Sequence, residues 1–130
     1  MIGVDTNLLV RYLTEDDAEQ TASAVRLLEG LTPEAPGFIG REVALELVWV
    51  LERSYGFSSG QIAATLGQLL LSGDVVIEQA GAVSEALRAY RTGGTDFADL
   101  MIRAAARRAG CTTLYTFDRR AARLEGTTLL

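Results

Sequence analysis

The sequence predicts a single α/β domain in which helices cover both faces of a central parallel sheet. Its 130 residues suit one domain and are enough to bury a core. Apolar residues make up 48% of the chain and only two residues are proline, which excludes a disordered chain. Short apolar runs alternate with longer stretches of helical periodicity, a pattern typical of parallel strands joined by helical crossovers.

The first third of the chain contains two predicted helices and two predicted strands. Asp5-Thr6 opens the first helix, because both residue types are preferred N-caps. The loop Thr32–Gly37 holds both prolines and ends the second helix. In chain order the elements are a strand at Ile2–Val4, helices at Asn7–Leu13 and Glu19–Leu31, and a strand at Phe38–Ile39.

The middle of the chain continues this alternation. A helix over Arg41–Arg53 places four apolar residues on one face at helical spacing, namely Val43, Leu47, Val50 and Leu51. Ser58-Ser59 caps a helix that runs to about Leu71. The apolar run Val75–Ile77 predicts a third strand, and a helix follows it to about Arg91.

The last third should place acidic residues where such a fold binds ligands. Gly93-Gly94 precedes a helix from Asp96 to Ala109, a fourth strand is predicted at Thr112–Phe117, and Thr127–Leu130 is a candidate fifth. Ligands of open parallel sheets gather outside the carboxyl ends of the strands. Asp5 ends the first strand and Asp118 directly follows the fourth.

The composition excludes several kinds of chemistry. The chain has no histidine, which removes serine–histidine and cysteine–histidine nucleophilic schemes and histidine-ligated zinc. All twelve basic residues are arginine, so a lysine base or Schiff base is also excluded. Seventeen carboxylates remain, and the net charge is −5. Such a charge argues against nucleic-acid binding, unless several acids act together as metal ligands.

The expected location is the cytoplasm, without membrane association. No apolar run approaches the ~20 residues that a membrane-spanning helix needs. The N-terminal segment lacks the basic region of a signal peptide. The single cysteine, Cys111, cannot form an internal disulfide and is compatible with a reducing compartment.

Acidic residues in four local motifs are the candidate functional residues. The motifs are Val4-Asp5-Thr6-Asn7, Ala44-Leu45-Glu46-Leu47, Thr95-Asp96-Phe97-Ala98-Asp99 and Thr116-Phe117-Asp118-Arg119. Asp96 and Asp99 are spaced i, i+3 and therefore share one face of their helix. Carboxylates that converge at one sheet edge repel each other unless a hard cation lies between them. Oxygen ligands alone select Mg²⁺, Mn²⁺ or Ca²⁺, and such a site suits phosphodiester hydrolysis.

Each acid also has a purely structural interpretation. Asp5, Asp96 and Asp118 all occupy positions where a helix N-cap is expected. Glu46 lies among apolar neighbours, where an unpaired buried carboxylate would be costly, but it could face solvent or pair with Arg53. Glu42 is one turn earlier, and we assign it to the helix dipole.

Other residues that could contact bases or phosphates also receive structural interpretations. We interpret Trp49 and Tyr55 as packing residues rather than base-stacking platforms. The cations Arg119, Arg120 and Arg123 are interpreted as part of a solvated face rather than as phosphate contacts.

At these motifs the sequence resembles the PIN-domain family, and within it the VapC-type toxins of toxin–antitoxin pairs. The resemblance covers essentially the whole chain and rests on Ile2–Asn7, Glu46–Leu51, Asp96–Asp99 and Thr116–Asp118. It implies an RNA-cleaving enzyme that uses Mg²⁺ or Mn²⁺. The metal-binding and catalytic acids it implies are Asp5, Glu46, Asp99 and Asp118, with Asp96 as an auxiliary acid and Thr6 and Thr116 as supporting hydroxyls.

The resemblance also implies an architecture and partners. The fold would be a three-layer α/β/α PIN-like domain over residues 1–130, with a sheet of four to five strands in the order 3-2-1-4-5. The partners would be an RNA substrate, a second copy in a homodimer, and an antitoxin that inserts a basic side chain into the acidic pocket. We expect an apolar antitoxin groove between the first two helices and the Arg41–Arg53 helix.

Two other functions remain as alternatives. One is a PIN-like module that has lost catalysis and acts by binding. The other is a receiver-type signalling domain with an acidic Mg²⁺ pocket, which expects an acidic pair after the first strand and a late lysine. Here Thr6-Asn7 follows Asp5 and the chain has no lysine, so the receiver domain is the weaker of the two.

Overall fold

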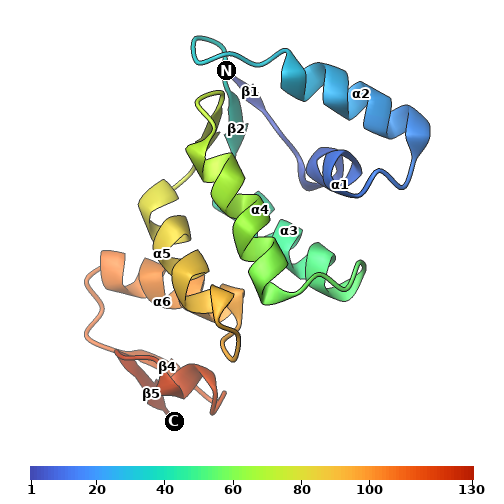
Figure 1. Ribbon diagram of the computed structural model, residues 1–130. Helices are drawn as coiled ribbons and strands as arrows, with labels where there is room; N and C mark the ends of the chain where they lie inside the picture. Colours follow the sequence, from blue (N-terminus) through green and yellow to red (C-terminus); the bar gives the residue numbers. More distant parts are fainter.

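The computed structural model describes all 130 residues and shows an α/β fold with parallel strands (Figure 1). The strands are β1 (Ile2–Gly3), β2 (Gly37–Ile39), β3 (Val75–Ile77), β4 (Leu114–Thr116) and β5 (Thr127–Leu129). The helices are α1 (Thr6–Thr14), α2 (Ala18–Glu29), α3 (Arg41–Arg53), α4 (Ser59–Leu71), α5 (Ala80–Arg91) and α6 (Phe97–Arg108), with a short 3₁₀ helix, η1, at Ala121–Arg123. All the predicted elements are therefore present, in the predicted order.

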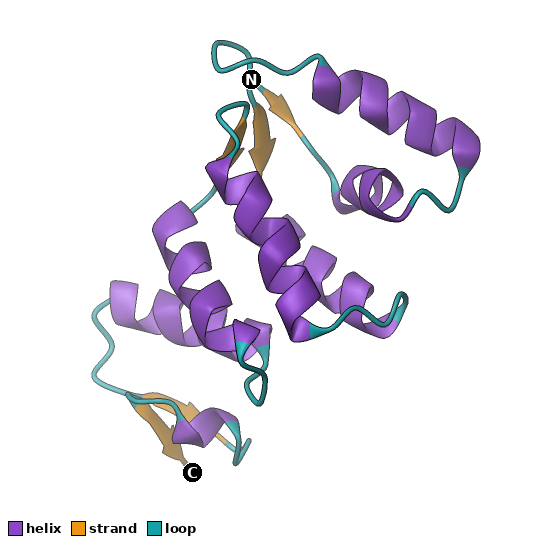
Figure 2. Ribbon diagram, viewed as in Figure 1, coloured by secondary structure: helices purple, strands orange, loops and turns teal.

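The strands form two separate sheets. One sheet has the order β1-β2-β3, and the other consists of β4 and β5; every pairing is parallel. In Figure 2 the two groups of strands lie at opposite ends of the molecule, with helices between them. The predicted α/β class and parallel strands are confirmed. The single sheet of four to five strands is not observed, because β1 and β4 are not paired.

Contacts with α6 and the loop before it explain the position of the β4–β5 pair. The Arg103 guanidinium donates to the Glu125 carbonyl at 3.4 Å, and the Arg120 guanidinium donates to the Gly94 carbonyl at 2.8 Å. The Cys111 N–H also donates to the Ala106 carbonyl and continues the end of α6. These bonds hold the β4–β5 pair beside α6.

Local capping fixes the starts of the helices close to the predicted positions. The Ser58 side chain accepts from the Gln61 N–H while the Gln61 side chain accepts from the Ser58 N–H, which completes a capping box at α4. At α2 the Asp17 carboxylate accepts from the Gln20 N–H at 2.9 Å, so this helix begins one residue before the predicted Glu19.

One apolar core connects the β1–β2–β3 sheet to the helices. Its most deeply buried side chains include Leu9, Leu47, Leu51, Ile62, Val83, Phe97 and Leu100. On α3 the fully buried residues are Ala44, Leu47, Val48 and Leu51, so the inward face is rotated from the predicted one, and Val43 and Val50 are only partly buried. None of the helices combines the length and apolarity needed to cross a membrane.

Candidate functional site

Asp5 connects β1 to α1 and acts as the N-cap of that helix. The Thr6 N–H donates to the Asp5 carboxylate at 2.8 Å, and the Asp5 side chain is otherwise exposed. Thr6 itself is buried, with 2% of its surface exposed. The structural interpretation of Asp5 as a cap is therefore confirmed, and the carboxylate keeps a solvent-facing side for a ligand.

Asp96 and Asp99 occupy the start of α6. The Asp96 carboxylate accepts from the Ala98 N–H at 2.8 Å as the N-cap, and Asp99 lies in the first turn. Phe97, which is 1% exposed, packs edge-on against the buried Tyr90 ring at a centroid distance of 5.7 Å. This aromatic pair anchors the helix start and thereby fixes both carboxylates.

Asp118 follows β4 and caps the turn that leads into η1. Its carboxylate accepts from the Arg120 N–H at 2.7 Å and from the Ala121 N–H at 2.9 Å. The Thr116 hydroxyl accepts from the Asp118 N–H at 3.0 Å and orients the residue. The two backbone N–H groups, with a smaller contribution from the Arg120 cation, lower the pKa of Asp118.

Electrostatic coupling joins these acids into one cluster, which we name the α6 acidic group: Asp96, Asp99 and Asp118. Partial burial raises the pKa of Asp99, and the negative charges of Asp96 and Asp118 raise it further, while Arg120 acts in the opposite direction. A carboxylate surrounded by like charges is held in a costly state that a cation would relieve. Neither Asp5 nor Glu46 is among the charges that raise the pKa of Asp99.

Glu46 lies on the exposed side of α3 and makes no ion pair. The structural interpretation of Glu46 as a solvent-facing residue is therefore confirmed, and the alternative pair with Arg53 is wrong. Trp49, one turn further on, is 58% exposed, and the Arg53 guanidinium lies over its ring at 6.0 Å. The interpretation of Trp49 as a packing residue is wrong. Tyr55 does pack partly against the core, and it donates a hydrogen bond to Asp16.

The family assignment follows from a comparison over almost the whole chain. The sequence profile of the PIN domain matches residues 2–126. The chain belongs to the PIN-domain family. A search among curated proteins finds no match. Among solved structures, VapC20 of Mycobacterium tuberculosis, a Sarcin-Ricin loop cleaving toxin, matches 95% of this chain and 94% of its own, with 23% identity and a TM-score of 0.48.

For a PIN domain, the donor types suit a hard divalent cation but their arrangement within one chain does not. Every candidate ligand is a carboxylate oxygen, the type that Mg²⁺ and Mn²⁺ prefer. However, nowhere in the structure do three or more acidic, histidine or cysteine side chains lie in an arrangement that could hold a metal ion. The predicted convergence of Asp5, Glu46, Asp99 and Asp118 on one pocket is therefore not seen in this chain conformation.

Arg120 is exposed, so its interpretation as part of a solvated face is confirmed. The sequence did not predict two further features: its guanidinium donates to the Gly94 carbonyl in the loop before α6, and its charge acts on Asp99. The sequence signal that could have drawn attention to Arg120 is its position two residues after Asp118. Its structural effect is to bring the end of β4 to the start of α6.

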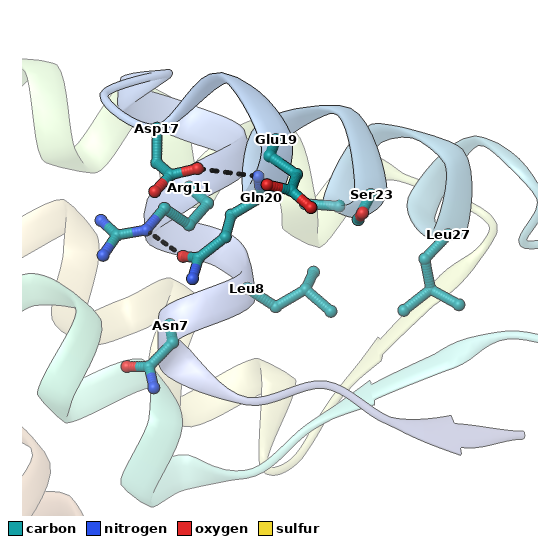
Figure 3. Close-up of a pocket in the computed structure, with 9 residues that line it drawn as sticks. Asn7, Leu8, Arg11, Asp17, Glu19, Gln20, Ser23 and Leu27 are labelled. Atoms are coloured by element: carbon teal, nitrogen blue, oxygen red, sulfur yellow. Dashed lines mark hydrogen bonds between the residues drawn. The ribbon is translucent and has the colours of Figure 1, made fainter.

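A groove with a volume of about 760 Å³ lies between α1 and α2. Figure 3 shows Leu8 and Leu27 toward one end and the polar side chains of Arg11, Asp17 and Gln20 toward the other. Only three of its nine lining residues are apolar, and none comes from α3. The expectation of an apolar groove that includes α3 is therefore wrong, because most residues lining this groove are polar and α3 does not contribute to it.

Proposed function

We propose that this PIN domain is a metal-dependent endoribonuclease and the toxin of a VapBC-type toxin–antitoxin pair. The observation that carries the proposal is membership of the PIN family over residues 2–126, together with acids at each of the four positions that resemble the family's motifs. The substrate is RNA and the reaction is hydrolysis of a phosphodiester bond.

In this proposal the acids differ in role according to their surroundings. The catalytic and metal-binding residues are Asp5, Glu46, Asp99 and Asp118, with Asp96 as an auxiliary acid and Thr6 and Thr116 as supporting hydroxyls. Mg²⁺ or Mn²⁺ is the cofactor that such an all-oxygen set selects. Asp99 is the central acid, because burial and two neighbouring carboxylates already disfavour its charge and a bound cation would favour it.

A second candidate function is a PIN-like binding module without catalysis. One observation favours it: Asp5, Asp96 and Asp118 are each engaged as caps by backbone N–H groups, so all three have a structural reason to be present. Glu46 and Asp99 make no side-chain hydrogen bond of this kind and are the residues that this alternative leaves unexplained.

The proposed partners are an antitoxin and a second copy of the chain. The α1–α2 groove is the proposed antitoxin site, since Leu8 and Leu27 offer apolar contacts next to the charged Asp17 and Glu19. A basic side chain of the bound antitoxin would neutralise the carboxylates of the proposed metal site. Arginine suits this role because its planar guanidinium binds two carboxylate oxygens. In a test, Leu8→Asp should abolish antitoxin binding measured by calorimetry, whereas the exposed-loop variant Glu34→Gln should bind normally.

RNA cleavage by matched variants tests the enzymatic function. The wild-type protein should cleave labelled RNA with Mn²⁺ and lose this activity in EDTA. Asp99→Asn should remove the activity while keeping the fold, and Glu34→Gln, a change of the same kind at an exposed loop acid, should retain it. Binding of the same RNA without cleavage by the wild-type protein would support the binding module instead.

A further inference from the structure

The outer edge of β1 is open. β1 is the terminal strand of its sheet, Ile2 is 42% exposed, and a side chain added at Gly3 would meet no atom within 4 Å. The Ile2 and Val4 N–H groups both donate to β2 or the residue before it. Since successive residues of a parallel strand bond in opposite directions, the N–H and C=O of Gly3 face this open edge.

β4 presents the complementary edge. It pairs with β5 on one side only, where Leu114 donates to the Gly126 carbonyl and the Thr116 carbonyl accepts from Leu130. By the same alternation, the N–H and C=O of Tyr115 face the open side, and the Tyr115 side chain is 62% exposed. Unpaired strand edges of this kind are templates for another strand.

Several free strand edges could pair, and the residues that follow β1 and β4 favour the pairing of these two strands. β1 leads into Asp5 and β4 leads into Asp118. Adjacent parallel strands lie about 4.8 Å apart and end at the same sheet edge. Pairing of β1 with β4 would therefore place Asp5 beside the α6 acidic group, which is the convergence that one chain lacks in this conformation.

The chain's own β4 is not positioned to make this pairing. Arg103 bonds the turn before β5 to α6, Arg120 bonds the segment after β4 to the loop before α6, and β1 lies at the other end of the molecule (Figure 1). A second copy in the same conformation offers both open edges at once. Two such joints related by a twofold axis would form a closed dimer in which each edge is covered.

We propose that two copies of this chain pair β1 of one with β4 of the other, and that each acidic site is shared. Asp5 of each site comes from one copy, and Asp96, Asp99 and Asp118 come from the partner. The assignment of a shared catalytic site rests on the proposed function, whereas the strand exchange itself rests on the two open edges.

Solution mass tests the exchange independently of activity. The wild-type protein should have twice the 14.0 kDa mass of one chain by light scattering. Tyr115→Pro removes the N–H on the open edge but spares the bonds of Leu114 and Thr116 to β5, so it should give a folded monomer. Tyr115→Thr keeps the N–H and should remain dimeric. A monomeric wild-type protein, or a dimer unaffected by Tyr115→Pro, would overturn the exchange.

Complementation between inactive variants tests the sharing of the site. Asp5→Asn and Asp99→Asn chains, co-expressed with different tags and purified through both, should regain about half of the wild-type cleavage, because one of the two sites in such a heterodimer is intact. The pair Asp99→Asn and Asp118→Asn should regain none, because both changes lie on the same side of the site. Equal inactivity of both pairs would overturn the sharing. A wild-type protein that does not cleave RNA would instead contradict the proposed function and leave the mass measurement to decide the exchange.

Discussion

The Arg120 guanidinium donates a 2.8 Å hydrogen bond to the Gly94 carbonyl and so ties the end of β4 to the start of α6. This contact joins two segments that the chain separates by a whole helix. Its consequence is electrostatic as well as structural, because it brings Asp118 and the Arg120 cation within range of Asp99.

Loss of this contact should change the ionisation of Asp99. In Arg120→Gln the cation that lowers the pKa of Asp99 is gone, so the pKa should rise further above its usual range. Carboxyl ¹³C chemical shifts during a pH titration would measure it. Arg119→Gln, one residue earlier and without this contact, is the matched control and should leave the titration unchanged. Identical titrations of the two variants would show that the Arg120 charge does not act on Asp99.

The pH dependence of stability should reveal the cost of Asp99. Its pKa is raised in the folded state by burial and by Asp96 and Asp118, so the folded state holds the proton more tightly than the unfolded state. Stability is therefore lost as the pH rises from the ordinary aspartate pKa of about 3.9 through the raised value. Asp99→Asn removes this loss. In urea unfolding, the free energy of unfolding of the variant should therefore exceed that of wild type by an amount that grows across that interval and then stays constant. A variant that is less stable than wild type at neutral pH would contradict this assignment.

Asp118 should show the opposite dependence. Its pKa is lowered by the N–H groups of Ala121 and Arg120, so its contribution to stability is present above the ordinary aspartate pKa. This contribution is lost as the pH falls through the lowered value. Asp118→Ala should consequently be less stable than wild type at pH 7, and the difference should disappear in acid. The same denaturant titrations provide the measurement, and a difference that persists at low pH would point to packing instead of ionisation.

The cap at Asp5 allows its structural and functional roles to be separated. Asp5→Asn keeps a side-chain acceptor for the Thr6 N–H and should leave the free energy of unfolding nearly unchanged. Asp5→Ala loses the cap and should lower that free energy by about 1 kcal/mol. Both variants should lose RNA cleavage. If Asp5→Asn retained cleavage at the wild-type rate, capping would be the sole role of Asp5.

The aromatic anchor of α6 should be essential for stability. Phe97 is fully buried against Tyr90, and Phe97→Ala leaves a cavity that should cost about 3–5 kcal/mol of unfolding free energy. The exposed Phe117, at 80% exposure, is the matched control, and Phe117→Ala should cost far less. Thermal melts of the two variants would measure the difference. Similar losses would show that Phe117 is covered in solution by another surface.

Much of the fold could be predicted from local sequence, and the assembly of the strands could not. Asp5, Ser58 and Asp96 mark helix starts because their side chains satisfy backbone donors a few residues away, which is a local interaction. The pairing of β4 depends instead on long-range contacts such as that of Arg120 with Gly94, which leave no periodic signal.

The same distinction between local and long-range interactions applies to the candidate site. The spacing of Asp96 and Asp99 predicts their shared helix face, and the structure couples them. The exposure of Trp49 was not predicted, because apolar residues surround it in the sequence and the inward face of α3 is set by its packing against neighbouring elements.

Binding of Mn²⁺, followed by electron paramagnetic resonance, tests most directly whether acids of the two separate sheets act as one metal site. Wild-type protein and Glu34→Gln should bind the ion with equal affinity. Asp99→Asn and Asp5→Asn should both weaken binding strongly, although the structure places Asp5 after β1 and Asp99 beside the β4–β5 pair. Wild-type affinity in Asp5→Asn, or no protein-bound Mn²⁺ in the wild-type protein, would contradict the account.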